Sequence, residues 1–145
     1  MADPCIPYKE EASHITGKVK TTQVVSKTFV KVSGVQLGSP ELGLVADGAS
    51  DKSGVYQVDP CVSGDAGLIP LGVAAYDCPV GGLLTIIREG IVPVTNGAAI
   101  TAGQYVEMNT AGKVIPHNTG TIIGIAMDSQ STVGGDTPIL LLLQG

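Results

Sequence analysis

Short apolar runs that end in glycine-rich turns recur in two matching stretches of this chain. In the first, Gly72-Val-Ala-Ala-Tyr-Asp77 is followed by a Val-Gly-Gly turn and another apolar run. In the second, Gly124-Ile-Ala-Met-Asp128 is followed by the same kind of turn and run. Upstream, Phe29–Val32 resembles Tyr105–Met108. Many short runs separated by Gly and Pro predict an all-β chain with internal duplication and little helix.

The duplication predicts how the β body is organised. Copy one covers about residues 28–90 and copy two about residues 104–145, within a single β domain over residues 21–145. Copy one carries an insertion over residues 34–54, and long loops on a repeated scaffold are where specificity is commonly placed.

Alternating residues predict which side of each strand is buried. Val30 and Val32 alternate with Phe29 and Lys31, and the same pattern recurs around Glu107, so each segment is expected to bury one face. Lys31 and Glu107 occupy matching positions, which we expect to face solvent. A mid-strand glycine at Gly72 and again at Gly124 indicates a close approach of the backbone to a neighbour.

The last apolar run has no polar side. A strand that is apolar on both faces needs a cover on each, either by closure of the sheet or by a subunit contact. The residues concerned are Ile139, Leu140, Leu141, Leu142 and Leu143.

The N-terminal residues differ from the rest, and we expect an extended arm over residues 1–20. Pro4 and Pro7 fix an extended backbone, while Ile6 and Tyr8 give the arm apolar surface to bury. Fourteen extended residues span about 45 Å, far enough to lie across a neighbouring molecule. A frayed terminus is the alternative.

Charge and apolar length exclude several classes of partner. The formal net charge of −5 argues against nucleic acid, whose binding depends on clustered Lys and Arg. The longest apolar run, Ile139–Leu143, is far shorter than the roughly 20 residues that a membrane span needs. No signal peptide is visible, so we expect folding in the cytoplasm.

Reactive chemistry is sparse. The three cysteines favour reduced, buried thiols, with a late Cys61–Cys78 bridge as the alternative. We find no phosphate-binding glycine loop, no nucleophile elbow and no metal-ligand spacing, and we expect His14 and His117 on the surface. The sequence therefore predicts neither catalytic, cofactor-binding nor metal-binding residues, and no enzyme.

Gly67-Leu-Ile-Pro-Leu-Gly-Val-Ala-Ala-Tyr-Asp77, with Gly81-Gly-Leu-Leu-Thr-Ile-Ile-Arg-Glu-Gly90, resembles the body of tailed-bacteriophage head decoration (capsid cement) proteins. Gly124-Ile-Ala-Met-Asp128 has the same rhythm, and Ala2–Tyr8 resembles the arm of such proteins from actinobacterial phages. The lambda decoration protein shares a weaker pattern. The resemblance implies a compact β-tulip or β-sandwich-like body that forms homotrimers. These would bind the major capsid protein at local three-fold positions of the expanded shell, on the outer surface of the virion.

The same resemblance suggests roles for particular residues. Pro4, Ile6, Pro7 and Tyr8 would contact the capsid, and Ile139–Leu143 would form core or trimer interface. Arg88 either pairs with an acid at an interface or lies solvated on the surface. The alternative function is an exported β-rich surface or adhesion module that binds a host ligand, although no export signal supports it. Two further alternatives are a small hydrolase or deaminase of an unrecognised type and a monomeric accessory domain that binds no capsid.

Overall fold

The computed structural model describes residues 14–35, 56–62 and 64–143. Every regular element in these ranges is a β-strand, which confirms the all-β prediction. The strands are β1 His14–Val19, β2 Phe29–Val35, β3 Tyr56–Pro60, β4 Gly72–Ala74, β5 Leu83–Ile87, β6 Ile91–Thr95, β7 Tyr105–Met108, β8 Val114–Pro116, β9 Gly124–Ala126 and β10 Asp136–Leu141.

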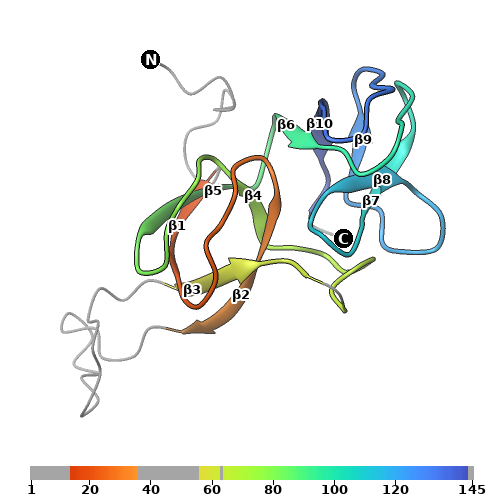
Figure 1. Ribbon diagram of the computed structural model, residues 1–145. Helices are drawn as coiled ribbons and strands as arrows, with labels where there is room; N and C mark the ends of the chain where they lie inside the picture. Colours follow the sequence, from red (N-terminus) through yellow and green to blue (C-terminus); the bar gives the residue numbers. More distant parts are fainter. Residues whose placement is uncertain (1–13, 36–55, 63, 144–145) are drawn as a thin grey trace, which may run out of the picture.

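The strands form two β units that lie side by side (Figure 1). In the first half, strands β1 to β5 close into a barrel in the order β1-β3-β2-β4-β5. In the second half, strands β6 to β10 form a sheet in the order β6-β10-β9-β7-β8. If β1 is matched with β6, β2 with β7 and so on to β5 with β10, the two orders contain the same neighbours apart from the β1–β3 pair, with the second order read in the opposite direction. The parallel β1–β3 pairing corresponds to a single parallel bridge between Asn96 and Val114 in the second half.

The pairing register repeats as well as the strand order. Val30 faces Gly72 and Pro60 in the first half, and Val106 faces Gly124 and Pro116 in the second. The Gly72 and Gly124 repeat that is visible in the sequence therefore reflects the same backbone pairing in both halves.

Two clusters of buried side chains form the core. The first fills the interior of the barrel and consists of Val19, Val24, Val30, Val58, Ala74, Cys78, Leu84 and Ile86. The second fills the inner side of the β6–β10 sheet, but it also contains four residues of the first half: Phe29, Cys61, Val73 and Ile87. The second core is thus completed by the outer wall of the barrel.

Two expectations about the first half need correction. The arm expected over residues 1–20 extends too far, because His14–Val19 forms β1 and pairs with β3 and β5. The expectation of one buried face for the strand from Phe29 is also wrong. Phe29 and Val30 are both fully buried, because the second half covers the outer side of β2, whereas Val32 is 47% exposed.

Candidate interaction surface

The apolar run at the end of β10 and just after it divides its residues between the core and the surface. Ile139, Leu141 and Leu143 are buried, whereas Leu140 is half-buried and Leu142 is 39% exposed. β10 lies between β6 and β9, so its main-chain partners are provided by the sheet. Only the outer side remains uncovered, and it carries leucines where a solvent-facing strand carries polar residues.

A pocket of about 520 Å³ opens at the end of β10. Its apolar lining comes from Ile122 and Leu140–Leu143, and Arg88, Glu89 and Gly90 form the rest. The Leu141 N–H donates to the Gly90 carbonyl at 3.0 Å, which fixes β10 against the link between the halves. A pocket of this size and lining suits an apolar group or side chain.

Apolar side chains continue from this pocket across the outer side of the sheet. Leu140 faces Ile91 on one side and Ile125 on the other, and Ile125 faces Tyr105. Ile91 and Tyr105 are 48% and 52% exposed. We call Ile91, Leu140, Ile125 and Tyr105 the outer row. A contiguous exposed apolar strip of this kind marks an interaction site.

Arg88 lies beside this surface but is held by the backbone. Its Nε donates to the Leu71 carbonyl at 2.9 Å, and the side chain is half-buried. This contact corrects the picture of a solvated surface arginine, and it anchors the cation at the wall of the pocket.

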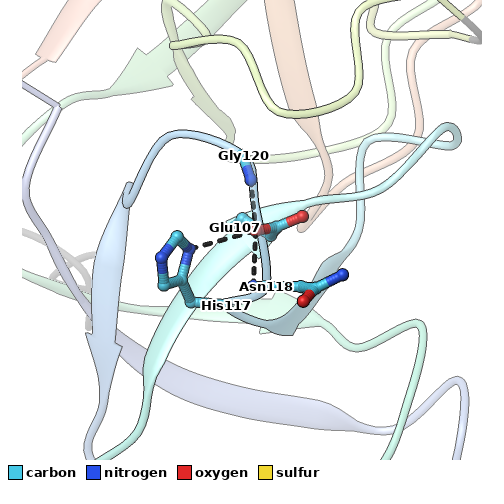
Figure 2. Close-up of polar contacts among 4 residues, drawn as sticks. All are labelled: Glu107, His117, Asn118 and Gly120. Carbon is cyan, nitrogen blue, oxygen red and sulfur yellow. Dashed lines mark hydrogen bonds and ion pairs between the residues drawn. The ribbon is translucent and has the colours of Figure 1, made fainter.

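Apart from the apolar surface, a polar site is buried under the loop that follows β8 (Figure 2). The Glu107 carboxylate accepts hydrogen bonds from the backbone N–H groups of Asn118 and Gly120, at 2.7 and 2.9 Å. His117 Nδ1 lies 3.1 Å from the same oxygen. Glu107 is only 7% exposed, so its expected solvent-facing position is wrong: the loop folds over it and supplies donors.

The electrostatics of this site favour an ionised carboxylate. Burial alone would raise the pKa of Glu107, but the two backbone N–H groups and His117 outweigh burial and lower that pKa. The loop in turn touches the first half, because the Thr121 N–H donates to the Gly67 carbonyl at 2.8 Å. Glu107 therefore stabilises the loop through which the second half is hydrogen-bonded to the first. Its spacing to His117 matches no motif, so sequence reasoning missed the pair.

The two thiols in the described residues are free and buried. The predicted pair of reduced, buried cysteines is confirmed for Cys61 and Cys78, and no bridge joins them. Burial raises the pKa of the Cys61 thiol to about 12, with Asp65 adding to the effect and Lys31 opposing it, and burial also raises the pKa of Cys78. Such thiols are poor nucleophiles.

Other kinds of site find little support in the part of the chain that the structure describes. Within residues 14–35, 56–62 and 64–143, no three His, Cys, Asp or Glu side chains gather as a metal site. No helix there is long and apolar enough to cross a membrane. The predicted capsid-contact residues Pro4, Ile6, Pro7 and Tyr8, and most of the 34–54 insertion, lie outside the described residues.

Comparison with known proteins adds a family and a fold. A family model described as phage cement protein matches residues 9–141. The solved structure of the head fiber gp8.5 N base in bacteriophage phi29 is similar, with a TM-score of 0.64, 17% sequence identity and coverage of 89% of this chain and 92% of that chain. No curated protein matches the chain. At this identity the structural likeness supports the fold alone.

Proposed function

Because this chain belongs to the phage cement protein family, we propose that it is a non-enzymatic protein of the virion that binds the phage capsid and stabilises it. The observation that carries the proposal is the family match, which spans residues 9–141 and so includes both β halves. The apolar surface of β10 supports an interaction role, and the buried, protonated thiols support the absence of covalent catalysis.

In this proposal the protein binds the major capsid protein of the expanded shell as a homotrimer, at local three-fold positions on the outer surface. It folds first in the cytoplasm of the bacterial host. A trimer that engages three equivalent sites gains roughly 10²–10⁴-fold in avidity over one site. Because it binds the assembled shell and not the separate subunits, it stabilises the shell by mass action.

The N-terminal arm supplies part of this contact. Pro4 and Pro7 restrict the free arm, which lowers the entropy lost on binding. Ile6 and Tyr8 supply apolar area, and an extended segment can add main-chain hydrogen bonds at an exposed sheet edge.

Shells that lack this protein provide the test. Purified protein added to them should raise the temperature at which the shell releases its contents. The Ile6→Asp and Tyr8→Ala variants should need higher concentrations for the same effect, while Lys9→Ala serves as a control in the same segment. A shell that is equally heat-sensitive with and without saturating protein would contradict the proposal.

A further inference from the structure

The outer row of the second half has an exact counterpart by register in the first half. In the barrel, His14 faces Ile87, Ile87 faces Val73, and Val73 faces Phe29. The pairs of the outer row follow the same order on β6, β10, β9 and β7. The two rows are therefore the same surface of two copies of one fold.

The second half covers three of the four residues of the row in the first half, and His14, at the end of the row, is exposed. Phe29, Val73 and Ile87 are 0%, 1% and 3% exposed, and they belong to the core that the second half builds. Main-chain contacts fix this packing: the Thr95 N–H donates to the Lys27 carbonyl at 2.8 Å, and the Phe29 N–H donates to the Gly112 carbonyl at 2.9 Å.

The row in the second half keeps apolar side chains without such a cover. Ile91 and Tyr105, at its two ends, are about half exposed. The pocket beside Leu140 extends this open surface. Among the described residues, none of the strands β1 to β10 covers this row as the second half covers the row of the first.

The second half covers the first with one particular side, which we call the covering side. The first half has an equivalent of this side, which is left exposed among the described residues. In the second half, Met108 and Gly112 meet the first half, and Met108 is 1% exposed, with its carbonyl bonded to the Gly67 N–H. By register the counterpart of Met108 in the first half is Val32, and Tyr56 lies two residues before Val58, the partner of Val32, as Gly112 lies two residues before Val114, the partner of Met108. Val32 and Tyr56 are 47% and 53% exposed. Among its described residues each chain thus offers one uncovered row and, at Val32 and Tyr56, an exposed equivalent of the covering side.

We infer that a second copy of this chain covers the outer row, presenting the Val32 and Tyr56 side of its first half. The contact between molecules repeats the contact between the halves of one molecule. Because two different surfaces meet, the contact is heterologous, and such contacts close into rings when the rotation permits. That the ring has three members rests on the proposed function; the pairing of the two surfaces does not.

Oligomeric mass tests the outer row. The full chain should have a mass of three times 14.7 kDa by light scattering. Tyr105→Glu should shift it to the mass of one chain, because its counterpart Phe29 is fully buried under the cover, and a carboxylate there would be desolvated without a partner. Val80→Glu is the matched control: Val80 is 53% exposed, on the β4–β5 turn and off both surfaces, so the mass should not change.

Disulfide capture tests which surfaces meet, without relying on a disruptive charge. Tyr105→Cys and Tyr56→Cys are made separately in chains that also carry Cys5→Ser, since Cys61 and Cys78 are buried. Mild oxidation of the mixed proteins should join one chain of each kind, and neither variant alone should form a covalent dimer. Efficient self-coupling of Tyr105→Cys would reveal a symmetric contact and overturn the inference.

Two further outcomes would also overturn it. A wild-type chain that is monomeric at every concentration tested would do so, and so would a chain lacking residues 2–13 that becomes monomeric, since the arm would then be the occupant. These results are distinguishable from failure of the proposed function. Monomers that still bind and stabilise shells would remove only the inference, whereas a stable trimer that binds no shell would remove only the proposed function.

Discussion

At the scale of single residues, two glycines hold equivalent strands at close range. A methyl group at Gly72 would lie 2.6 Å from the Ile87 carbonyl oxygen, and one at Gly124 would lie 2.7 Å from the Leu140 carbonyl oxygen. Backbone atoms of a paired strand cannot move aside without breaking the pairing. The close approach that the mid-strand glycines predict is confirmed in both halves.

Gly72→Ala and Gly124→Ala should each lower the free energy of unfolding by about 1–3 kcal/mol, the usual cost of forcing an extra group into packed structure. Gly34→Ala is the control, because the nearest atom to its added methyl group belongs to the end of the Gln57 side chain and not to the backbone of a paired strand. Urea unfolding measures all three. Equal stability of Gly72→Ala and Gly34→Ala would show that the close approach is unimportant.

Glu107 shows what the sequence could not reveal at this scale. Its burial depends on a loop ten or more residues away that folds back and points two N–H groups at the carboxylate. No local pattern encodes that return. In contrast, Lys31 at the matching position is half-buried and forms an ion pair with Asp65 at 2.8 Å. Its environment is therefore nearer to the solvent-facing position that the sequence predicts.

The pH dependence of stability in a Glu107 variant tests the role of this carboxylate. Because folding lowers the pKa of Glu107, its ionised form stabilises the native state above the unfolded pKa of about 4.3, and this contribution is lost as pH falls through the lower folded value. Glu107→Gln should therefore reduce stability near pH 7 by about 1–3 kcal/mol and flatten the decline toward acid pH.

The flattening should be partial, since the pKa values of Asp59 and Asp65 are also lowered. Asp128→Asn, at an exposed position, is the control for loss of one negative charge. Urea midpoints between neutral and acid pH give both profiles. Parallel profiles for Glu107→Gln and the wild type would contradict the assigned role.

At the scale of elements, alternation predicted the strands that begin at Phe29 and Tyr105, and the repeated runs between turns predicted those at Gly72, Gly124 and the last apolar run, but β1 was not separated from the arm. β1 was absorbed into the predicted arm because Gly17, between Ile15 and Val19, hides the period of two. A side chain at position 17 would collide with those of Ile86 and Val58, which fill this part of the barrel. The apolar run that ends β10 predicts a cover on each face; the core covers one face, the other is partly exposed, and the sequence could not tell which residues lie on which face.

The alternation between buried and exposed side chains over residues 139–143 should be visible in stability. Ile139→Ala, in the core, should cost about 2–5 kcal/mol, whereas Leu142→Ala should cost roughly 1 kcal/mol or less when both are measured at concentrations at which the chain is monomeric. The two variants control for each other, since they change residues of similar size on one segment. Equal losses would place both side chains in the core.

At the scale of the whole molecule, the two halves differ in whether each forms a complete hydrophobic core from its own residues. The first half closes its barrel around its own interior cluster. The second half completes its core with Phe29, Cys61, Val73 and Ile87 from the first. The repeat in the sequence predicted two similar units, but not that one depends on the other, because the dependence comes from packing between distant residues.

A fragment of residues 90–145 should therefore lack cooperative structure, while a fragment of residues 1–90 should retain β structure and associate through its uncovered apolar wall. Circular dichroism during urea titration distinguishes the two. A sigmoidal unfolding transition for residues 90–145 alone would contradict this dependence.

We propose that this protein binds the assembled phage shell and not its separate subunits. Saturation binding of purified protein to expanded shells that lack it, with unexpanded procapsids as the control, measures this binding. We predict saturation at three copies per local three-fold position, on expanded shells only. Absence of saturable binding to either kind of shell would overturn the proposed function.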